Sequence, residues 1–500
     1  MKSNKQYRPW NPSQAHLFPP SPHEWLEDGD LAYFILDTVE VLDLGAIEAA
    51  IAAKDPRGTR PHHPKMMTAL LLYGYCIGVM SSRKIEQATH RDVAFRVIAG
   101  GNHPDHSRIS DFRRQHLATL HGLFLQTVRL AQKAGLVRLG RVGLDGTKVK
   151  ANASKHKAMS YKRMLKAEAE LREEIEQLLA LAEQTDQQED RRFGAGQRGD
   201  EVPAELQRRE SRLAKLREAM AQLEAEAAQA RVQVLNERAE QHQRRAEAED
   251  DPDERQHAAG LAAKAKAQAA ELGDDDDDAP PSPTRGAGAG DLPHHRVPHT
   301  PQGKPTGKAQ RCFTDGDSRI MKRDGAYLQG YNGQAAVDDQ RLIIVACAVT
   351  NQAPDQQHLP PLLQQVNDNC GTYPDKLLAD AGYWDERHVD FCEKHGVDPF
   401  IATKRYKHGE SPPPVRGRPP KDLDARGRMY RKLRTKKGRA EYARRKAIPE
   451  PVFGQIRTGQ GFGHFLLRGL DKVRAEWALV CAGHNLLKIW RAGTHIPSLA

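Results

Sequence analysis

The stretch KLLADAGYWD, residues 376–385, places a carboxylate directly after an apolar run. The run at 377–379 predicts a short buried strand, and Asp380 follows it at once, ahead of Gly382. An acid in this position is either a turn residue or a metal ligand. A ligand would need partners from elsewhere in the chain.

A second acid follows β-prone residues in VGLDGTKVK, residues 142–150. The apolar run that begins at Val142 ends at Asp145-Gly146, and the residues after it alternate between apolar and polar. This pattern predicts a hairpin or strand pair with Asp145 near its turn.

Strands and helices alternate around these two acids. We expect two strands within 327–350, a helix over 358–369, the strand before Asp380 and a further strand near 397–404. The fold class is therefore an α/β layer architecture that a helical segment interrupts. Where the strands of such a sheet end, side chains from different strands can meet.

Residues 1–140 read as an N-terminal all-α domain. Apolar segments at 31–44 and 64–80 predict packed helices, and Ser107 is placed to cap a further helix that carries Arg113 and Arg114. A short helix, a turn and a basic helix are compatible with a DNA-binding helix-turn-helix. An ordinary helical bundle with basic surface residues explains the same pattern.

Heptad repeats fill residues 158–272. The apolar positions of the first seam are Met164, Leu171, Ile175, Leu178 and Ala182, and those of the second are Leu206, Leu213, Leu216, Met220, Leu223, Ala227, Ala230 and Val234. The break at 191–203 favours an antiparallel helical hairpin, and a dimerising coiled coil is the alternative. Residues 273–310, acidic and rich in Pro and Gly, predict a flexible linker.

Positive charge is concentrated in one segment. The whole chain of 500 residues carries a formal charge of +10, whereas residues 404–447 hold 17 Lys and Arg and four Asp and Glu, a formal charge of +13. A field of that size attracts nucleic acid. A solvated basic tail is the alternative, but the segment lies between two apparently folded blocks and not at an end. Within it, VRGRPPK (415–421) resembles an AT-hook through Arg416 and Arg418, and a plain Pro-rich linker is the competing interpretation.

The six cysteines are scattered and form no CxxC pair, which argues against a disulfide framework or a structural zinc site. The chain has no apolar run long enough for a membrane span, and its N-terminus lacks the apolar segment of a secretory signal. We therefore expect a reducing, cytoplasmic location.

A third acid, Glu450, stands on a predicted helix that follows Pro449. If Asp145, Asp380 and Glu450 converge, their charges repel each other unless cations intervene. Mg²⁺ prefers such oxygen ligands, and two ions can clamp a phosphoryl displacement. Taken singly, each acid is more often a turn or surface residue than a metal ligand.

Four motifs resemble the DDE transposases of bacterial insertion sequences, a family with an RNase H-like catalytic core. They are RPHHPKMMTALLLYGYCIGVMSSRKIEQA (60–88), VGLDGTKVKANASKHKAMSY (142–161), LLADAGYWDE (377–386) and PEPVFGQIRTGQGFGHFLLRGLDKVRAEWALVCAGHNLLKI (449–489). The resemblance covers nearly the whole chain.

The resemblance implies roles for individual residues. Asp145, Asp380 and Glu450 match the catalytic acids, which in this family hold two Mg²⁺ ions, with Mn²⁺ as a substitute. Tyr442, Arg445 and Arg457 match the other positions of a Tyr–Arg–Glu–Lys signature that contains the glutamate. The gap from Arg445 to Glu450 is one residue longer than is common, and Arg457 stands where lysine is usual.

The resemblance also implies a function and partners. The protein would bind the terminal inverted repeats of an insertion sequence, cleave the DNA and transfer the freed strand to target DNA, acting as a homodimer on DNA in the bacterial cytoplasm and nucleoid. A catalytically inactive DNA-binding relative, or a nuclease of the same fold without strand transfer, are the alternatives. In this interpretation the core comprises 141–157 and 311–500, with 158–272 inserted.

Overall fold

The computed structural model describes residues 24–53, 60–193, 204–273, 292–405, 413–418, 420 and 422–493. Side chains at 181–193 and 204–206 are not described, so the predicted seam positions Ala182 and Leu206 and most of the break at 191–203 lie outside the described side chains. No helix in the described ranges is long and apolar enough to cross a membrane.

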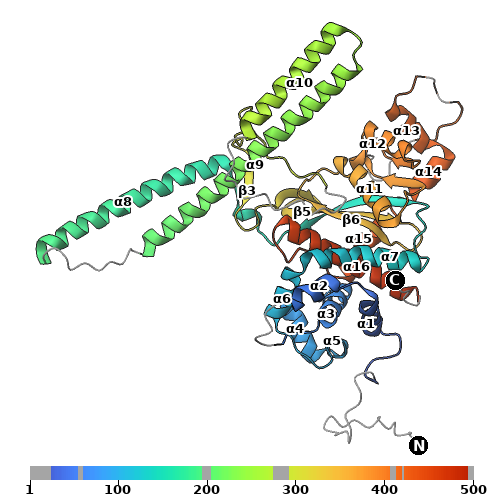
Figure 1. The fold of residues 1–500 in the computed structure, drawn as a ribbon, viewed down its shortest axis with the longest axis horizontal. Helices are drawn as coiled ribbons and strands as arrows, with labels where there is room; N and C mark the ends of the chain where they lie inside the picture. Colours follow the sequence, from blue (N-terminus) through green and yellow to red (C-terminus); the bar gives the residue numbers. More distant parts are fainter. Residues whose placement is uncertain are drawn as a thin grey trace, which may run out of the picture.

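A mixed six-stranded sheet lies at the centre of the body (Figure 1). Its strands are β1 (Val142–Lys150), β4 (Arg319–Arg323), β5 (Ala326–Asp338), β6 (Ile344–Thr350), β7 (Lys376–Ala379) and β8 (Asp398–Ile401). The order is β4-β5-β1-β7-β8, and β6 also pairs with β5. β5 is antiparallel to β1 and to β6, whereas β7 is parallel to β1 and to β8.

β1 corrects the turn that was expected near Asp145 in a hairpin or strand pair at 142–150. The strand continues through Asp145 and Gly146 to Lys150, because it pairs with β5 along its whole length. Its pairing with β7 covers only Val142 and Gly143. Asp145 therefore lies in mid-strand, but at the point where the β7 edge of β1 becomes free.

Seven helices precede β1 in the described residues. They are α1 (Leu31–Val41), α2 (Gly45–Ala52), α3 (Pro64–Ile77), α4 (Ser82–Arg91), α5 (Val93–Ala99), α6 (His106–Gln115) and α7 (Leu117–Lys133). The cap of α6 is Asp105, whose carboxylate accepts from the backbone N–H of Arg108, and not the predicted Ser107. The helix predicted to follow this cap breaks at His116, between α6 and α7.

The C-terminal half contributes six further helices to the body. They are α11 (Leu359–Cys370), α12 (Glu386–Lys394), α13 (Ala425–Arg434), α14 (Lys436–Ala443), α15 (Pro449–Gly454) and α16 (Leu470–Arg491). The predicted basic loop at 404–447 thus contains two helices. Asp424 and Thr435 start them, each accepting a hydrogen bond from a glycine N–H three residues on.

One hydrophobic core joins the N-terminal helices to the sheet. The buried α16 packs against α3 and α7 on one side and β6 on the other (Figure 1). The Asn485 side chain bonds both backbone groups of Ile344 in β6, and the Gly483 carbonyl accepts a hydrogen bond from the Cys76 thiol in α3. The predicted boundary at residue 140 does not divide this core.

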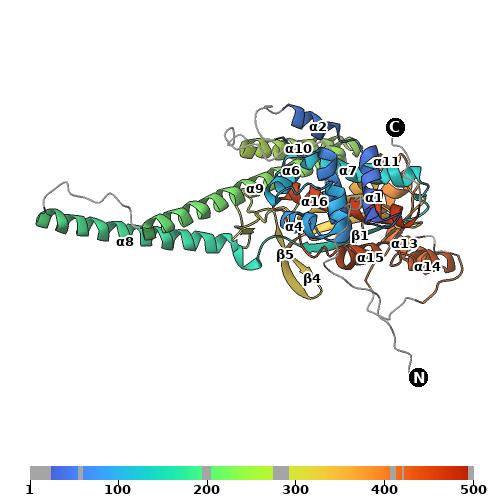
Figure 2. The same ribbon diagram turned by 90° about the horizontal axis from the view of Figure 1, so that it is seen from below.

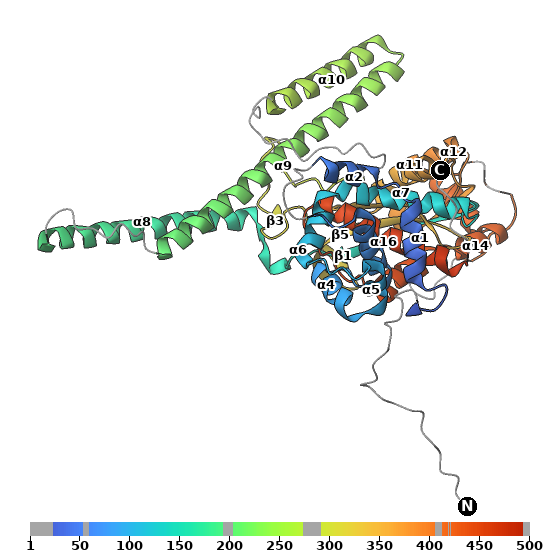
Figure 3. The same ribbon diagram turned by 60° about the horizontal axis from the view of Figure 1, so that its bottom comes forward.

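The insertion forms two helical arms that project from the body (Figures 1 and 3). Its helices are α8 (Tyr161–Phe193), α9 (Ala204–Ala248) and α10 (Pro252–Gly273). α8 packs on the first part of α9 through side chains that include Leu171, Ile175 and Leu216. α10 packs along the second part of α9, and their buried positions are mostly alanine.

The base of the insertion is closed by a two-stranded sheet, β2 (Ala158–Ser160) with β3 (Gln310–Cys312). Residues 292–310, predicted as part of a flexible linker, pack onto the arm, since Val297 and Ala309 contact Leu223 and Ala227 of α9. The insertion therefore leaves and rejoins the core at one place. Figure 2 shows the β4–β5 hairpin projecting beside it.

Candidate active site

The three predicted acids gather around one arginine. A guanidinium nitrogen of Arg445 lies 3.1 Å from Oδ2 of Asp145 and 3.9 Å from Oδ2 of Asp380, and the other lies 3.8 Å from Oε1 of Glu450. The Arg445 side chain is 13% exposed, whereas that of Glu450 is 51% exposed. Residues separated by some 300 positions in sequence thus form one partly buried anionic pocket.

Asp145 enters this pocket from the free edge of β1. Its Oδ1 accepts a hydrogen bond from the backbone N–H of Gly146 at 2.9 Å. Only glycine fits at position 146, because the side-chain amide of Gln334, its cross-strand neighbour in β5, fills the space that a β-carbon would need. The Asp145-Gly146 pair is thus a continuous strand segment and not a turn.

Asp380 directly follows β7, as the sequence predicted. Its Oδ1 accepts from the N–H of Gly382 at 2.7 Å, which starts a short 3-10 turn over Ala381–Tyr383. This bond fixes the carboxylate at the strand end. A β-carbon at Gly382 would lie 2.9 Å from that same oxygen, so glycine leaves room for the acid.

Glu450 reaches the pocket because α15 lies close to β1. A β-carbon at Gly143 would lie 2.9 Å from Cδ of Pro449 and 3.1 Å from Cγ2 of Ile448. The missing side chain at Gly143 therefore lets the start of α15 approach the strand that carries Asp145. Glu450 sits in the first turn of α15, where the helix dipole favours a negative charge.

Burial governs the protonation of Asp145. Loss of solvent raises the pKa of its carboxyl to about 6, with Asp380 and Asp355 contributing in the same direction. The Arg445 charge and the Gly146 hydrogen bond oppose this rise. The neighbouring carboxylates thus disfavour the charged form of Asp145, and the charge of Arg445 favours it.

The remaining signature residues lie at the pocket on separate elements. Tyr442 is near the end of α14. Burial raises the pKa of its hydroxyl to about 12, and the charges of Asp380 and Asp145 also raise this pKa. Arg457 lies on a π-helical turn, Gln455–Gly459, is exposed, and donates to Oγ1 of Thr147 at 2.8 Å. The predicted signature is therefore spread over two helices and the turns after them.

The other predicted DNA-contacting arginines differ in exposure. Arg113 is only 5% exposed and donates to the carbonyl of Met80, so the prediction that it contacts DNA is wrong. Arg114 is exposed and pairs with Asp111. Arg416 and Arg418 are exposed, and the backbone carbonyl of Arg416 accepts from Arg431.

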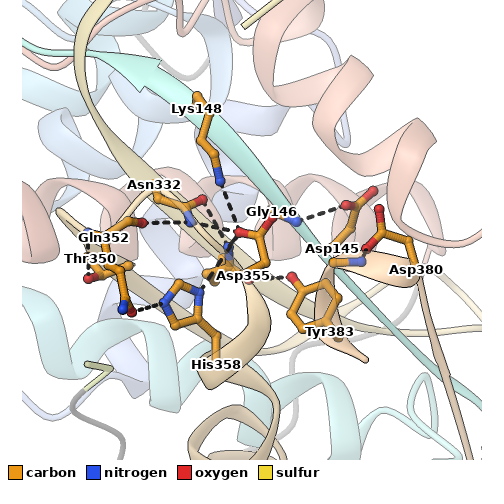
Figure 4. Close-up of polar contacts among 12 residues, drawn as sticks. Asp145, Gly146, Lys148, Asn332, Thr350, Gln352, Asp355, His358, Asp380 and Tyr383 are labelled. Atoms are coloured by element: carbon orange, nitrogen blue, oxygen red, sulfur yellow. Dashed lines mark hydrogen bonds and ion pairs between the residues drawn. The ribbon is translucent and has the colours of Figure 1, made fainter. Parts of the chain in front are cut away.

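Two polar groups beside the pocket were not predicted. Asp355, between β6 and α11, pairs with Lys148 of β1 at 2.9 Å (Figure 4). Glu441 in α14 pairs with Arg141 before β1 at 2.7 Å and with Lys376 of β7 at 2.8 Å. No local pattern marks either acid, because each acquires its partners only through the sheet.

The donor set of the pocket fits a divalent cation in its chemistry. Three carboxylates on separate elements offer the hard oxygen ligands that Mg²⁺ prefers. As placed, they surround the Arg445 guanidinium, and in the described part of the chain no three His, Cys, Asp or Glu side chains are close enough together to hold a metal ion. Binding of an ion would therefore require Arg445 to move.

Comparison with known families identifies the class. Two family models match, the transposase DDE domain over residues 288–486 and a transposase domain (DUF772) over residues 22–115. Both families indicate transposase function, and together they span more than half of the chain.

The chain thus contains a transposase DDE domain, and the two matches together support an insertion-sequence DDE transposase. A DDE domain implies an enzyme with an RNase H-like core, and the mixed sheet agrees with this; such domains generally use divalent metal ions. The DDE match contains Asp380 and Glu450 but not Asp145, which the sheet brings to them from before the insertion. No curated protein and no solved structure showed significant similarity.

Proposed function

We propose that this protein cleaves double-stranded DNA at the ends of its insertion sequence and joins the freed 3′ ends to target DNA. The observation that carries the proposal is the convergence of Asp145, Asp380 and Glu450 within 4 Å of one guanidinium. We further propose that the sheet with α11, α15 and α16 is an RNase H-like core, in which Asp145 and Asp380 come from adjacent parallel strands.

In the proposed reaction, a water oxygen attacks a phosphorus atom at the element end, and the bond to the 3′ oxygen breaks. The released 3′-OH then attacks a phosphodiester of the target, so no covalent bond to the protein forms. Divalent ions held by Asp145, Asp380 and Glu450 would supply the charge that activates the attacking oxygen and stabilises the leaving one.

The protein's own residues perform the rest. Asp145 and Asp380 are fixed by backbone hydrogen bonds on the core, whereas Glu450 is half exposed and able to adjust. Arg445, which lies among the acids in this structure, would move aside when ions bind and would then bind the phosphate whose charge increases in the transition state. Arg457 is exposed and bonded to Thr147, two residues after Asp145 on β1, so it can bind the DNA backbone next to the acids.

The partners follow from the same proposal. The exposed cations of α13 and α14, together with Arg416 and Arg418, precede Arg445 and Glu450 in the chain and are suited to the phosphates of both element ends and target DNA. Since two DNA ends must be brought together, we propose that the protein acts on DNA as a homodimer.

The test is a cleavage and joining assay on duplexes that carry the ends of the element, in Mg²⁺ or Mn²⁺. Asp145→Asn, Asp380→Asn and Glu450→Gln should each lower cleavage by on the order of 10³-fold or more and leave DNA affinity nearly unchanged. Cleavage without joining would indicate a hydrolytic nuclease. Full cleavage by any of the three variants would refute the assignment of that acid.

A further inference from the structure

A fourth carboxylate, Asp355, lies close enough to Asp145 for its charge to act on that acid, but it is not among the carboxylates that pair with Arg445 in the described structure. Its side chain is 21% exposed and comes from the segment between β6 and α11 (Figure 4). The proposed chemistry does not use it. Its hydrogen bonds, however, belong to a network that reaches, through Gln334, from the strand of Asp145 to the turn after Asp380.

One oxygen of Asp355 is saturated by donors from β1 and β5. Its Oδ1 accepts from Nζ of Lys148 at 2.9 Å, from Nδ2 of Asn332 at 2.7 Å and from Nε2 of Gln334 at 2.8 Å. Lys148 is three residues after Asp145 on the same strand. Three donors on one oxygen fix the lateral position of these side chains.

Gln334 extends the connection to the turn after β7. Its Oε1 accepts a hydrogen bond from the hydroxyl of Tyr383, a fully buried residue three positions after Asp380. Its amide also fills the space beside Gly146, where a β-carbon would clash. One amide thus contacts both the residue after Asp145 and the turn of Asp380.

The other oxygen of Asp355 lies near Gly382, in the turn that follows Asp380. Oδ2 of Asp355 lies 3.6 Å, and Oδ1 of Asp380 2.9 Å, from the point where a β-carbon of Gly382 would stand. The backbone pairing of β1 with β7 has ended before this point, at Gly143 and Leu378. Side-chain hydrogen bonds therefore take over the joining of the two elements at the pocket.

We propose that Asp355 is a positioning residue that, through Lys148 and Gln334, sets the distance between Asp145 and Asp380. The inference rests on the proposed function of that acid pair. It assigns Asp355 no contact with the reacting atoms. Loss of the network would leave the acids present but poorly spaced, which reduces metal affinity more than it reduces folding.

The experiment compares Asp355→Asn, Lys148→Met and Gln334→Met in the full-length protein. The control is Asp339→Asn, a carboxylate of similar exposure, 17%, that pairs with Arg141 at the β5–β6 turn. Mn²⁺ binding without DNA is followed by electron paramagnetic resonance, and cleavage of element-end duplexes gives kcat and KM. Thermal unfolding reports the fold.

We expect each network variant to raise the apparent Kd for Mn²⁺ about 10–100-fold. We also expect each to lower kcat about 10²-fold with KM for DNA unchanged. The control should match the wild type. The inference is overturned if Asp355→Asn keeps the Mn²⁺ affinity and kcat of the wild type. It is also overturned if Asp355→Asn loses Mn²⁺ affinity and kcat but Lys148→Met and Gln334→Met do not, since Asp355 would then act directly.

The inference and the proposed function fail separately. If wild type cleaves and Asp145→Asn does not, the function stands whatever Asp355→Asn does. If wild type does not cleave, the function fails, and an unchanged Mn²⁺ affinity in Asp355→Asn overturns the positioning role as well. A weakened Mn²⁺ affinity in all three network variants would still support positioning of the acids.

Discussion

The guanidinium of Arg445 compensates three carboxylates that would otherwise repel each other, and their side chains range from 19% exposed at Asp145 to 51% exposed at Glu450. Only one of its contacts, to Asp145, is at normal hydrogen-bond distance, and its Nε has no hydrogen-bond partner. The arginine is therefore held by charge more than by directed bonds. A divalent cation could replace it without breaking a specific bonding pattern.

Replacing Arg445 by Met should therefore make stability depend on divalent cations. In EDTA we expect a loss of about 1–3 kcal/mol, because the acids lose their only shared cation in the described structure. Adding Mg²⁺ should restore more stability in Arg445→Met than in wild type, by linkage of binding to folding. Thermal unfolding with and without Mg²⁺ measures both effects. An equal Mg²⁺ effect in the two proteins would contradict this role.

Glu441 predicts a distinct dependence on pH. Hydrogen bonds from Arg141 and Lys376 lower the pKa of its carboxyl to about 2, against an ordinary value of 4.5. The folded state therefore binds this proton less readily than the unfolded chain, so the stabilisation is complete above pH 4.5 and is lost as the pH falls from 4.5 to 2.

In Glu441→Gln this acid-sensitive contribution disappears. At pH 7 we expect a loss of about 1–3 kcal/mol, and near pH 2 a difference close to zero. Denaturant unfolding between pH 2 and 7 gives the comparison. If the two profiles stay parallel over this range, Glu441 is not held in its ionised form by these partners.

At this scale the sequence predicted the acids that follow recognisable strand patterns or family motifs. Asp380 was readable because an apolar run precedes it, and Glu450 because of its signature. Asp355 and Lys148 were not, since their ion pair joins residues 207 positions apart and neither flank carries a pattern. Arg113 was misjudged because a charged residue on a short polar helix is usually exposed, whereas Tyr75 and Met80 accept its bonds here.

At the scale of elements, the approach of α15 to β1 depends on Gly143. The sequence predicted both elements but not their contact, because nothing in a single glycine states which helix will cover it. The strand was also predicted to end at Asp145, since Asp-Gly usually marks a turn. Pairing with β5 through Gly146 overrode that local preference.

Gly143→Ala should displace Glu450 and leave the fold intact. The added carbon would meet Pro449 and Ile448, which cannot move without carrying the first turn of α15 with them. We expect cleavage to fall about 10–100-fold, as for a small displacement of a catalytic group. The matched control is Gly454→Ala in the same helix, where no atom lies within 4 Å of the added carbon.

Both Gly143→Ala and Gly454→Ala should bind element-end DNA as wild type does. Equal cleavage rates for Gly143→Ala and Gly454→Ala would show that α15 tolerates the shift and that the close packing at Gly143 is unrelated to the site.

At the scale of the whole molecule, α16 ties the N-terminal helices to the catalytic sheet. The sequence predicted a separate all-α domain at 1–140, because predicted strands follow the helices there and a change of secondary structure resembles a domain boundary. Helix α16, more than 300 residues later, packs against both the N-terminal helices and the sheet and completes the core that they share. Such a connection is invisible in any local window of sequence.

The contact between α3 and α16 predicts that a side chain added at Gly483 in α16 destabilises the protein, whereas one added at Gly260 in α10 does not. A β-carbon at Gly483 would lie 3.2 Å from the Tyr75 carbonyl carbon and 3.3 Å from the Cys76 nitrogen, so Gly483→Val should force the helices apart. We expect a loss of about 1–3 kcal/mol, even though valine favours a helix more than glycine does. Gly260→Val in α10, with no atom within 4 Å of the added carbon, should not destabilise the protein.

Because one core joins the N-terminal helices to the sheet, Gly483→Val should still unfold in a single transition, in which the helices and the sheet unfold together. Hydrogen exchange monitored by mass spectrometry would show α3 and β6 losing protection at the same denaturant concentration. If α3 lost protection well before β6, the N-terminal helices would be a separate folding unit, and the DNA-binding role expected for them could be tested on that fragment alone.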